Sequence, residues 1–112
     1  MNLGLKLIFS ALILSGILHG SLVIAEEVYS ITIKDHQFAP AELTIPANTK
    51  IKIVVENQDA TVEEFESYDL NREKVVSGNG KIILFIGPLK PGTYKYFGEF
   101  HSETAQGVII AQ

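Results

Sequence analysis

The sequence predicts an all-β protein, a two-sheet sandwich of about seven short strands that follows a cleavable signal peptide. Apolar and polar residues alternate at a period of two in several segments, which is typical of strands with one buried face. Turn-forming residues separate these segments at short, regular intervals. Little of the sequence after residue 25 has apolar residues at helical spacing, which argues against an α/β fold.

The first 25 residues have the pattern of a secretory signal peptide. Lys6 precedes an apolar run at 7–18, which is shorter than the ~20 residues that a membrane-spanning helix needs. Val23 and Ala25 stand at the −3 and −1 positions of a signal peptidase site, so we predict cleavage after Ala25. The alternative is a retained N-terminal anchor, and in both cases the remainder faces the exterior. We expect residues 26–112 to form one domain with one modest core.

Alternation and proline define the first three predicted strands. Residues 28–33 alternate apolar and hydroxyl side chains, which predicts a strand with one buried face. The segment 38–40 ends in proline, which cannot donate a ladder hydrogen bond, so we expect it to interrupt pairing. A short strand at 43–46 also ends in proline, and a turn at 47–48 leads into a third strand at 50–55.

The remaining strands are predicted at residues 63–68, 82–86, 93–97 and 107–111. In the first of these we expect Phe65 to point inward. Residues 69–74 are the one stretch where a helical turn is plausible, and the glycine and asparagine residues of 77–80 are a strong turn signal. The nearly continuous apolar run at 82–86 favours a strand buried deep in the sandwich.

Composition restricts the chemistry that the protein can perform. Without Lys6, 8 basic residues stand against 13 acidic ones, a net charge of −5, which argues against a nucleic-acid partner and favours cations. The chain has no cysteine, which excludes disulfides, cysteine nucleophiles, iron–sulfur clusters and thiolate–copper bonds. No Ser-His-Asp or glycine-rich phosphate-binding pattern is present.

Segments spread over the whole predicted domain resemble the cupredoxin family, which implies a Greek-key β-sandwich. These segments are Phe-Ala-Pro at 38–40, Leu-Thr-Ile-Pro-Ala at 43–47, Glu-Asn-Gln-Asp at 56–59, Gly-Pro-Leu-Lys-Pro-Gly-Thr-Tyr at 87–94 and Phe-Gly-Glu-Phe-His at 97–101, followed by Gly107. A narrower resemblance rests on Glu-Glu-Phe-Glu-Ser at 63–67 and Asn-Arg-Glu-Lys at 71–74. These are similar to small periplasmic cupredoxin-like proteins and to the cupredoxin domain of Efe-type lipoproteins, which accompany bacterial iron permeases.

The resemblance places the copper ligands of the family on other residue types in this chain. The cysteine position falls on Gly98, the histidine that follows it on His101, and the first histidine on Glu63. The methionine region falls near Ala105 and Gln106. Only one of the four usual ligands survives, so a trigonal blue-copper site is excluded. Carboxylate and imidazole donors suit iron or Cu(II) and disfavour Cu(I).

We therefore predict a metal site at the end of the sandwich, formed by Glu63, Glu66, Glu99, His101 and His36. Glu99 and His101 are two residues apart, so in an extended segment both side chains reach the same side. Glu63 shares its strand phase with the inward Phe65 and is the first choice on that strand, with Glu66 second; a bulge would reverse this phase and bring Glu64 to the site.

Each of these residues also has a simpler interpretation. Glu99 and His101 are then a solvated acid beside a hydrogen-bonded histidine, and His36 is an ordinary surface histidine. Glu66 can instead pair with Arg72, whose mixed-charge neighbours are typical of a solvent-facing segment.

The leading functional hypothesis is a periplasmic metal-binding protein that holds iron or Cu(II). The family resemblance implies that it supports ferrous or ferric iron uptake by a membrane permease. We expect binding without catalysis, but two alternatives stay open. One is a copper-dependent ferroxidase or electron-transfer protein. The other is a metal-free interaction module that has kept only the surface of the fold.

Overall fold

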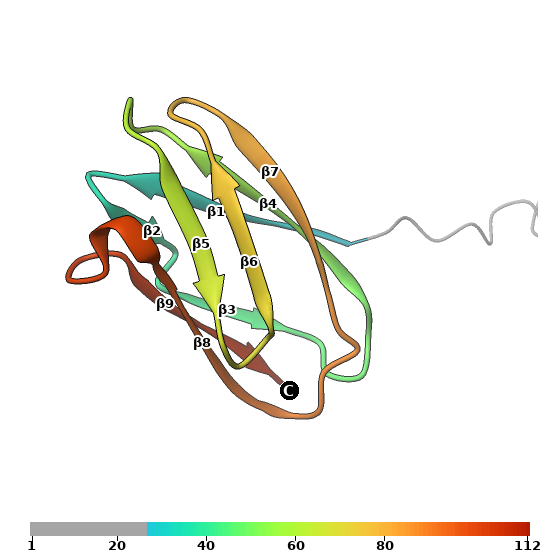
Figure 1. The fold of residues 1–112 in the computed structure, drawn as a ribbon. Coiled ribbons are helices and arrows are strands. Elements are labelled where there is room, and N and C mark those ends of the chain that lie inside the picture. The colour runs from blue at the N-terminus through green and yellow to red at the C-terminus, as the bar shows by residue number, and fades with distance from the viewer. Residues whose placement is uncertain (1–26) are drawn as a thin grey trace, which may run out of the picture.

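The computed structural model describes residues 27–112, so the predicted signal peptide and its cleavage site lie outside the described residues. The described chain is a two-sheet sandwich of nine strands (Figure 1). The strands are β1 (Val28–Lys34), β2 (Gln37–Ala39), β3 (Glu42–Ile45), β4 (Ile51–Asn57), β5 (Glu63–Ser67), β6 (Arg72–Val76), β7 (Lys81–Ile86), β8 (Gly92–Gly98) and β9 (Gln106–Ala111). A single 3₁₀ turn, η1 (Glu99–His101), follows β8. Within residues 27–112 no helix has the length and apolar character needed to cross a membrane.

The two sheets are built from strands that are distant in the sequence. One sheet has the order β2-β1-β4-β7 and the other β3-β9-β8-β5-β6. The β1–β4 and β3–β9 pairs are parallel, whereas the other pairs are antiparallel. Because the chain crosses repeatedly between the sheets, most strand partners are not consecutive, as in Greek-key sandwiches. The all-β sandwich predicted from the sequence is confirmed.

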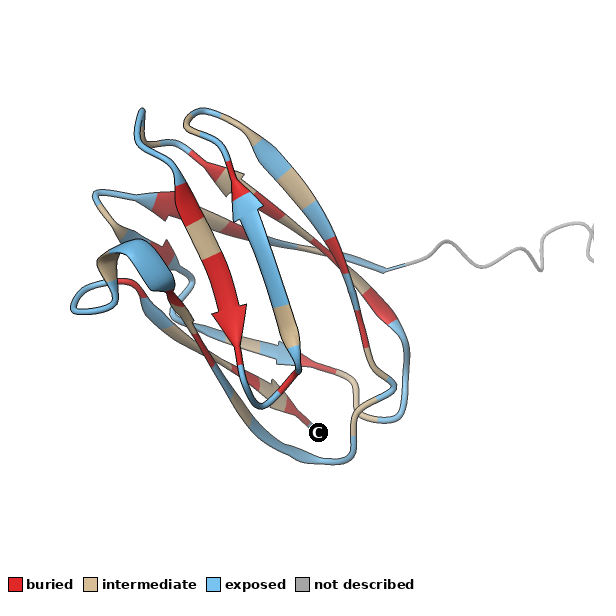
Figure 2. Ribbon diagram, in the orientation of Figure 1, coloured by how far each residue is buried: buried red, intermediate tan, exposed pale blue. Residues whose placement is uncertain are grey.

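The core lies between the sheets and takes alternate side chains from each inner face (Figure 2). In β1 and β4 the inward residues, such as Ile31 and Val55, are completely buried. The rings of Phe38, Phe65 and Tyr96 pack together, with centroids 4.9 Å apart for the two pairs that include Tyr96. This aromatic cluster holds β2, β5 and β8 together, so it positions the ends of the strands that carry the candidate site.

The structure has two strands that the sequence analysis did not predict. β2 ends just before Pro40 and pairs only with β1, so the proline follows an edge strand and breaks no pairing. The turn before β2 consists of Asp35 and His36, both with positive φ, and their backbone N–H groups donate to the carboxylate of Asp59 at 2.8 and 2.9 Å. A distant side chain therefore stabilises this hairpin.

The second unpredicted strand is β6, which occupies part of the stretch where a helical turn was expected. Only residues 69–71 form a turn, and Arg72–Val76 pairs with β5 along its whole length. The prediction of a deeply buried strand at 82–86 is also wrong. β7 is an edge strand in which Ile83 and Phe85 are 43% and 47% exposed. Hydrophobicity alone does not distinguish a central strand from an edge strand.

Candidate metal centre

Glu63 is the first residue of β5 and its side chain points into the sandwich. It is 1% exposed and lies on the same strand face as the buried Phe65. Glu64, on the opposite face, is half-buried. No bulge interrupts the pairing of β5 with β6. The prediction that Glu63 shares a strand face with Phe65 is therefore confirmed, and Glu63, not Glu64, faces the end of the core.

The Glu63 carboxylate is held by three hydrogen bonds. Its Oε1 accepts the backbone N–H groups of Glu64 and Phe100, both at 2.9 Å. Its Oε2 lies 2.7 Å from Nδ1 of His101. Because a carboxylate is only an acceptor, the proton of this pair is on Nδ1 of the histidine. Nε2 of a neutral His101 is then left with a free lone pair.

Gly98, the residue before η1, provides the space that this carboxylate fills. A Cβ at this position would lie 2.7 Å from Cδ and Oε2 of Glu63 and 2.8 Å from Cβ of Ala105. A cysteine there would collide with the carboxylate, and the chain has no cysteine in any case. The residues present therefore do not fit a thiolate–copper centre, whose cysteine position falls on Gly98.

His36 brings a second imidazole to the same place. The tight turn between β1 and β2 projects its ring onto that of His101, with centroids 3.6 Å apart and planes inclined by 9°. Its Nε2 is 3.3 Å from the hydroxyl oxygen of Thr61. Because imidazole lone pairs lie in the ring plane, the lone pairs of two parallel rings do not converge. One ion could bind both rings only after one of them rotates.

The two histidines open onto a surface cavity of about 390 Å³, which we call the histidine hollow. It is lined by His36, Glu99, Phe100, His101, Ser102, Glu103 and Thr104. The side chain of His101 is 27% exposed, whereas Glu63 lies behind it and does not line the hollow. The accessible donors are therefore imidazole nitrogens and the exposed carboxylates of the loop, and Glu63 is placed to orient His101.

The structure brings together only some of the residues predicted for the site. Glu63, His101 and His36 are in contact, and Glu99 lies at the rim of the hollow. The expectation of an extended segment at Glu99 and His101 is wrong, because these residues form η1, so the two-residue spacing does not put them on one side.

Glu66 lies apart from Glu63, on the other face of β5. There it groups with Glu64 and Glu73, whose carboxylate oxygens lie within 4.8 Å of one another and of an oxygen of Glu66. The alternative pairing with Arg72 does not form either. The Arg72 guanidinium instead donates to the backbone carbonyls of residues 70, 71 and 85.

Two residues that support the site were not singled out in the sequence. Asp59 anchors the turn that carries His36, and the N–H of His36, followed by that of Asp35, holds the pKa of this carboxyl below its usual range. Asn57 is 1% exposed; its Nδ2 donates to the carbonyl of Thr61 at 2.8 Å, and its Oδ1 accepts the N–H of Asp59 at 3.0 Å. Their signals in the sequence were a polar turn after a strand and the segment at 56–59 that resembles the cupredoxin family, and neither assigned them a role at the site.

Comparisons of the sequence with known proteins found a matching family model and a similar protein. A family model described as the cupredoxin-like domain matches residues 6–111. An uncharacterized protein of Rickettsia prowazekii (strain Madrid E) is 54% identical over 80 residues, which are 71% of this chain and 64% of that protein. The match therefore spans less than two thirds of the length of this relative.

Solved structures show the same architecture at low identity. Auracyanin A from Chloroflexus aurantiacus, a "blue" copper protein, has a TM-score of 0.67 at 15% identity, over 79% of this chain and 100% of that one. Amicyanin from Paracoccus versutus has a TM-score of 0.62 at 14% identity, over 80% and 85% of the two chains. A chain of a heme-copper terminal oxidase dimer has a TM-score of 0.64 at 18% identity, over 98% and 96%. With the fold shared and the family model matching nearly the whole sequence, this chain belongs to the cupredoxin-like domain family.

Proposed function

We propose that this protein is an exported, non-enzymatic metal-binding protein that holds iron or Cu(II) at the histidine hollow and supports iron uptake by a membrane permease. The observation that carries the proposal is the 2.7 Å hydrogen bond between Glu63 and His101. Metal-ligating histidines commonly donate their second ring N–H to a carboxylate, which fixes the tautomer and makes the other nitrogen a better ligand. Glu63 does this for His101, whose remaining nitrogen, Nε2, is then the primary ligand.

The other ligands come from the same hollow. His36 contributes a second imidazole when its ring turns out of the stack with His101, a rotation that breaks the stacking and the 3.3 Å contact with Thr61. Glu99 contributes an exposed carboxylate from the rim. Imidazole and carboxylate together suit Fe(II), Fe(III) and Cu(II). The metal is cargo in this proposal, since an open, shallow site permits transfer to a partner.

The cellular role rests on the sequence. The signal pattern at 1–25 supports export to the periplasm, and the segments at 63–67 and 71–74 support a place beside a bacterial iron permease, through their similarity to Efe-type proteins. An excess of acidic side chains on the mature protein favours cations over anions as cargo.

Calorimetric titration of the metal-free mature protein with Cu(II), and with Fe(II) under anaerobic conditions, tests the proposal. We expect His101→Ala to weaken binding by at least about tenfold and His36→Ala to weaken it less. Glu42→Gln, which removes an exposed carboxylate on β3, is the matched control and should bind like the parent. Equal affinities for the parent and His101→Ala would overturn the proposal.

One observation favours a second candidate, a metal-free interaction module. The Glu63 carboxylate already has three hydrogen-bond donors and fills the space at Gly98, so the pair with His101 is complete without an ion. This candidate predicts that Cu(II), Zn(II) and Fe(II) leave the melting temperature unchanged. Metal binding at the histidine hollow instead predicts an increase that disappears in His101→Ala, because a ligand of the folded state stabilises it.

A further inference from the structure

We propose that Arg72 and Lys74 of β6 prevent the free edge of β7 from pairing with a second copy of this chain. We call these two side chains the basic clamp. They lie on the side of the sandwich where β6 and β7, the edge strands of the two sheets, run next to each other (Figure 1). The proposal does not depend on a metal at the histidine hollow, since neither residue lines that cavity.

Each sheet has two edge strands, whose unpaired backbone groups are a template for pairing with another chain. The edge strands are β2 and β7 in one sheet and β3 and β6 in the other. β2 and β3 have only three and four residues, and a proline directly follows each of them, so both are poor templates. β6 and β7 have five and six residues and contain no proline, so they need a different protection.

β7 has the features of a strand that associates with itself. Residues 82–86 are five consecutive apolar residues with no charge among them, and Ile83 and Phe85 are exposed. The carbonyl groups of these two residues accept hydrogen bonds from side chains of β6, so they point away from β4. In an antiparallel strand the N–H and C=O of one residue point to the same edge. A second β7 would therefore meet the backbone of Ile83 and Phe85 and cover both side chains.

The basic clamp occupies this edge. Nη2 of Arg72 donates to the carbonyl of Phe85 at 3.0 Å, and Nη1 donates to two carbonyls of the turn before β6 at 3.2 and 3.3 Å. Nζ of Lys74 lies 3.5 Å from the carbonyl oxygen of Ile83. An approaching strand would have to displace both charged groups, and the guanidinium would lose hydrogen bonds that join the two sheets.

The strand phase of β6 explains why these two residues reach β7. Arg72 and Lys74 share the phase of Val76, which is completely buried. They stand opposite Ser67 and Phe65, two buried residues of β5. Positions of this phase normally carry apolar side chains, but inward-pointing charges on an edge strand are a known protection against pairing. The long stems of arginine and lysine let the charged groups leave the core and extend to the neighbouring sheet.

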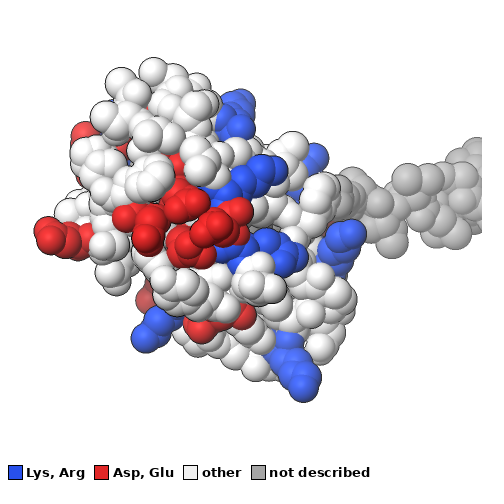
Figure 3. Space-filling view, viewed as in Figure 1, with Lys and Arg blue, Asp and Glu red and all other residues white. Residues whose placement is uncertain are grey.

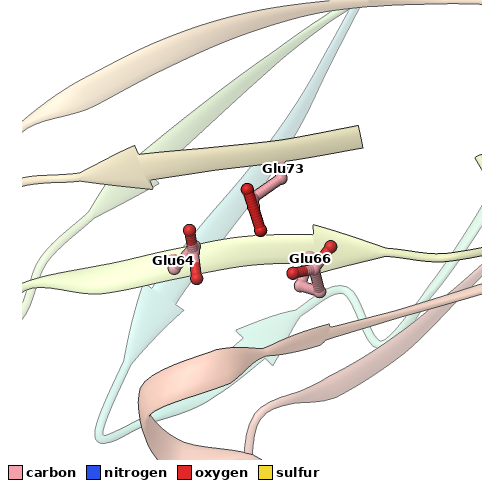
Figure 4. A group of neighbouring side chains, drawn as sticks. All are labelled: Glu64, Glu66 and Glu73. Atoms are coloured by element: carbon pink, nitrogen blue, oxygen red, sulfur yellow. The ribbon is translucent and has the colours of Figure 1, made fainter. Parts of the chain in front are cut away.

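The two cations bind backbone carbonyls although carboxylates are close to them. Glu73 lies between them in the sequence, but its side chain projects to the outer face of the sheet, toward Glu64 and Glu66 (Figure 4). No ion pair of residues 27–112 includes a residue of the basic clamp. Figure 3 shows the acidic side chains gathered in one patch with basic side chains beside it. The alternation in β6 therefore directs the acid outward and the cations to the edge of β7.

Sedimentation velocity of the mature protein, with a metal chelator to exclude dimers bridged by metal, tests the basic clamp. The double variant Arg72→Met/Lys74→Met keeps the apolar stems but removes the donors. We expect a monomeric parent and a dimeric double variant, whose dimer dissociation constant is lower by at least about tenfold. Lys74→Met alone, which leaves the hydrogen bonds of Arg72 in place, should show a smaller change in the same direction. Lys90→Met/Lys95→Met removes the same charge from two exposed positions, so this matched control should stay monomeric.

Two further measurements locate the dimer contact. Ile83→Lys, added to the double variant, should restore the monomer, because it puts a charge in the middle of the exposed apolar strand. Hydrogen exchange should slow at the amides of Ile83 and Phe85 in the dimer of the double variant. A double variant that melts at a lower temperature but stays monomeric would overturn the proposal, because the two side chains would then only join the sheets. Equal dimerisation of the parent or of the matched control would overturn it as well.

Discussion

Replacement of Gly98 by alanine tests whether the Glu63 carboxylate occupies the space beside the end of β8. The backbone of Gly98 has φ −92° and ψ 114°, which alanine adopts without strain. If the space were open, the substitution would stabilise the protein by about 0.4–1 kcal/mol, because alanine has less freedom in the unfolded chain. Whether Gly98→Ala raises or lowers the free energy of unfolding therefore shows whether the space beside Gly98 is occupied.

The structure instead predicts that Gly98→Ala destabilises the protein. The added Cβ would lie 2.7 Å from Cδ and Oε2 of Glu63 and 2.8 Å from Cβ of Ala105, distances at which the neighbours must move. Overpacking of a buried site costs about 1–3 kcal/mol, so after the backbone gain we expect a net loss of about 1–2 kcal/mol. For a domain of this size that lowers the melting temperature by about 4–16 °C.

The assay is a double-mutant cycle measured by urea and thermal unfolding. Gly98→Ala should cost at least about 0.5 kcal/mol less in a Glu63→Ala background, where the carboxylate is gone, although the contact with Ala105 persists. With Glu103→Ala, which removes an exposed carboxylate, the effects should add. A stabilising Gly98→Ala, or strict additivity with Glu63→Ala, would refute the placement of this carboxylate.

Four further outcomes are expected. Glu63→Gln keeps the shape of the side chain but removes the carboxylate from His101, so calorimetry should show Cu(II) affinity lowered about 10–100-fold; an unchanged affinity would contradict the orienting role. The lowered pKa of Asp59 contributes stability above the unfolded-state pKa of about 3.9, and this is lost as the pH falls through the folded-state value; Asp59→Asn should lose less stability on acidification in urea unfolding. The raised pKa of Glu66 has the opposite effect on how stability depends on pH. With a metal chelator present, the free energy of unfolding should decline as the pH rises from about 4.3 through the folded-state pKa of Glu66, and Glu66→Gln should flatten this decline. Tyr96→Phe removes a buried hydroxyl without a partner among the described residues, so the free energy of unfolding should stay constant or rise by about 1 kcal/mol, and a clear decrease would reveal a hidden partner.

Local patterns in the sequence were sufficient for the fold class and for part of the site. The alternation at 28–33 and 50–55 reports directly which face of a strand is buried, and β1 and β4 bury those residues. The same rule put Glu63 in phase with Phe65, which the structure confirms. The absence of cysteine excluded a thiolate–copper bond with no structural information at all.

Other features depend on which strands become neighbours, and no local pattern contains that information. The apolar run of β7 is an edge strand because nothing pairs beyond it, and β6 is a strand because β5 offers it a partner. Asp59 supports His36 across 23 residues of chain. Such contacts arise only when the sheets assemble.

The sequence by itself determined an all-β sandwich without thiol chemistry and the types of side chain that could bind an ion. The tertiary structure decided which of those side chains lie close together and which lie on different faces of the sheet. Glu63 and Glu66 are three residues apart, but an odd separation puts them on opposite faces of β5. Glu63 lies against His101 at the end of the core, and Glu66 lies against Glu73 on the outer face. The partners of each were set by the strands that pack beside it, since a carboxylate acquires its chemistry from its neighbours.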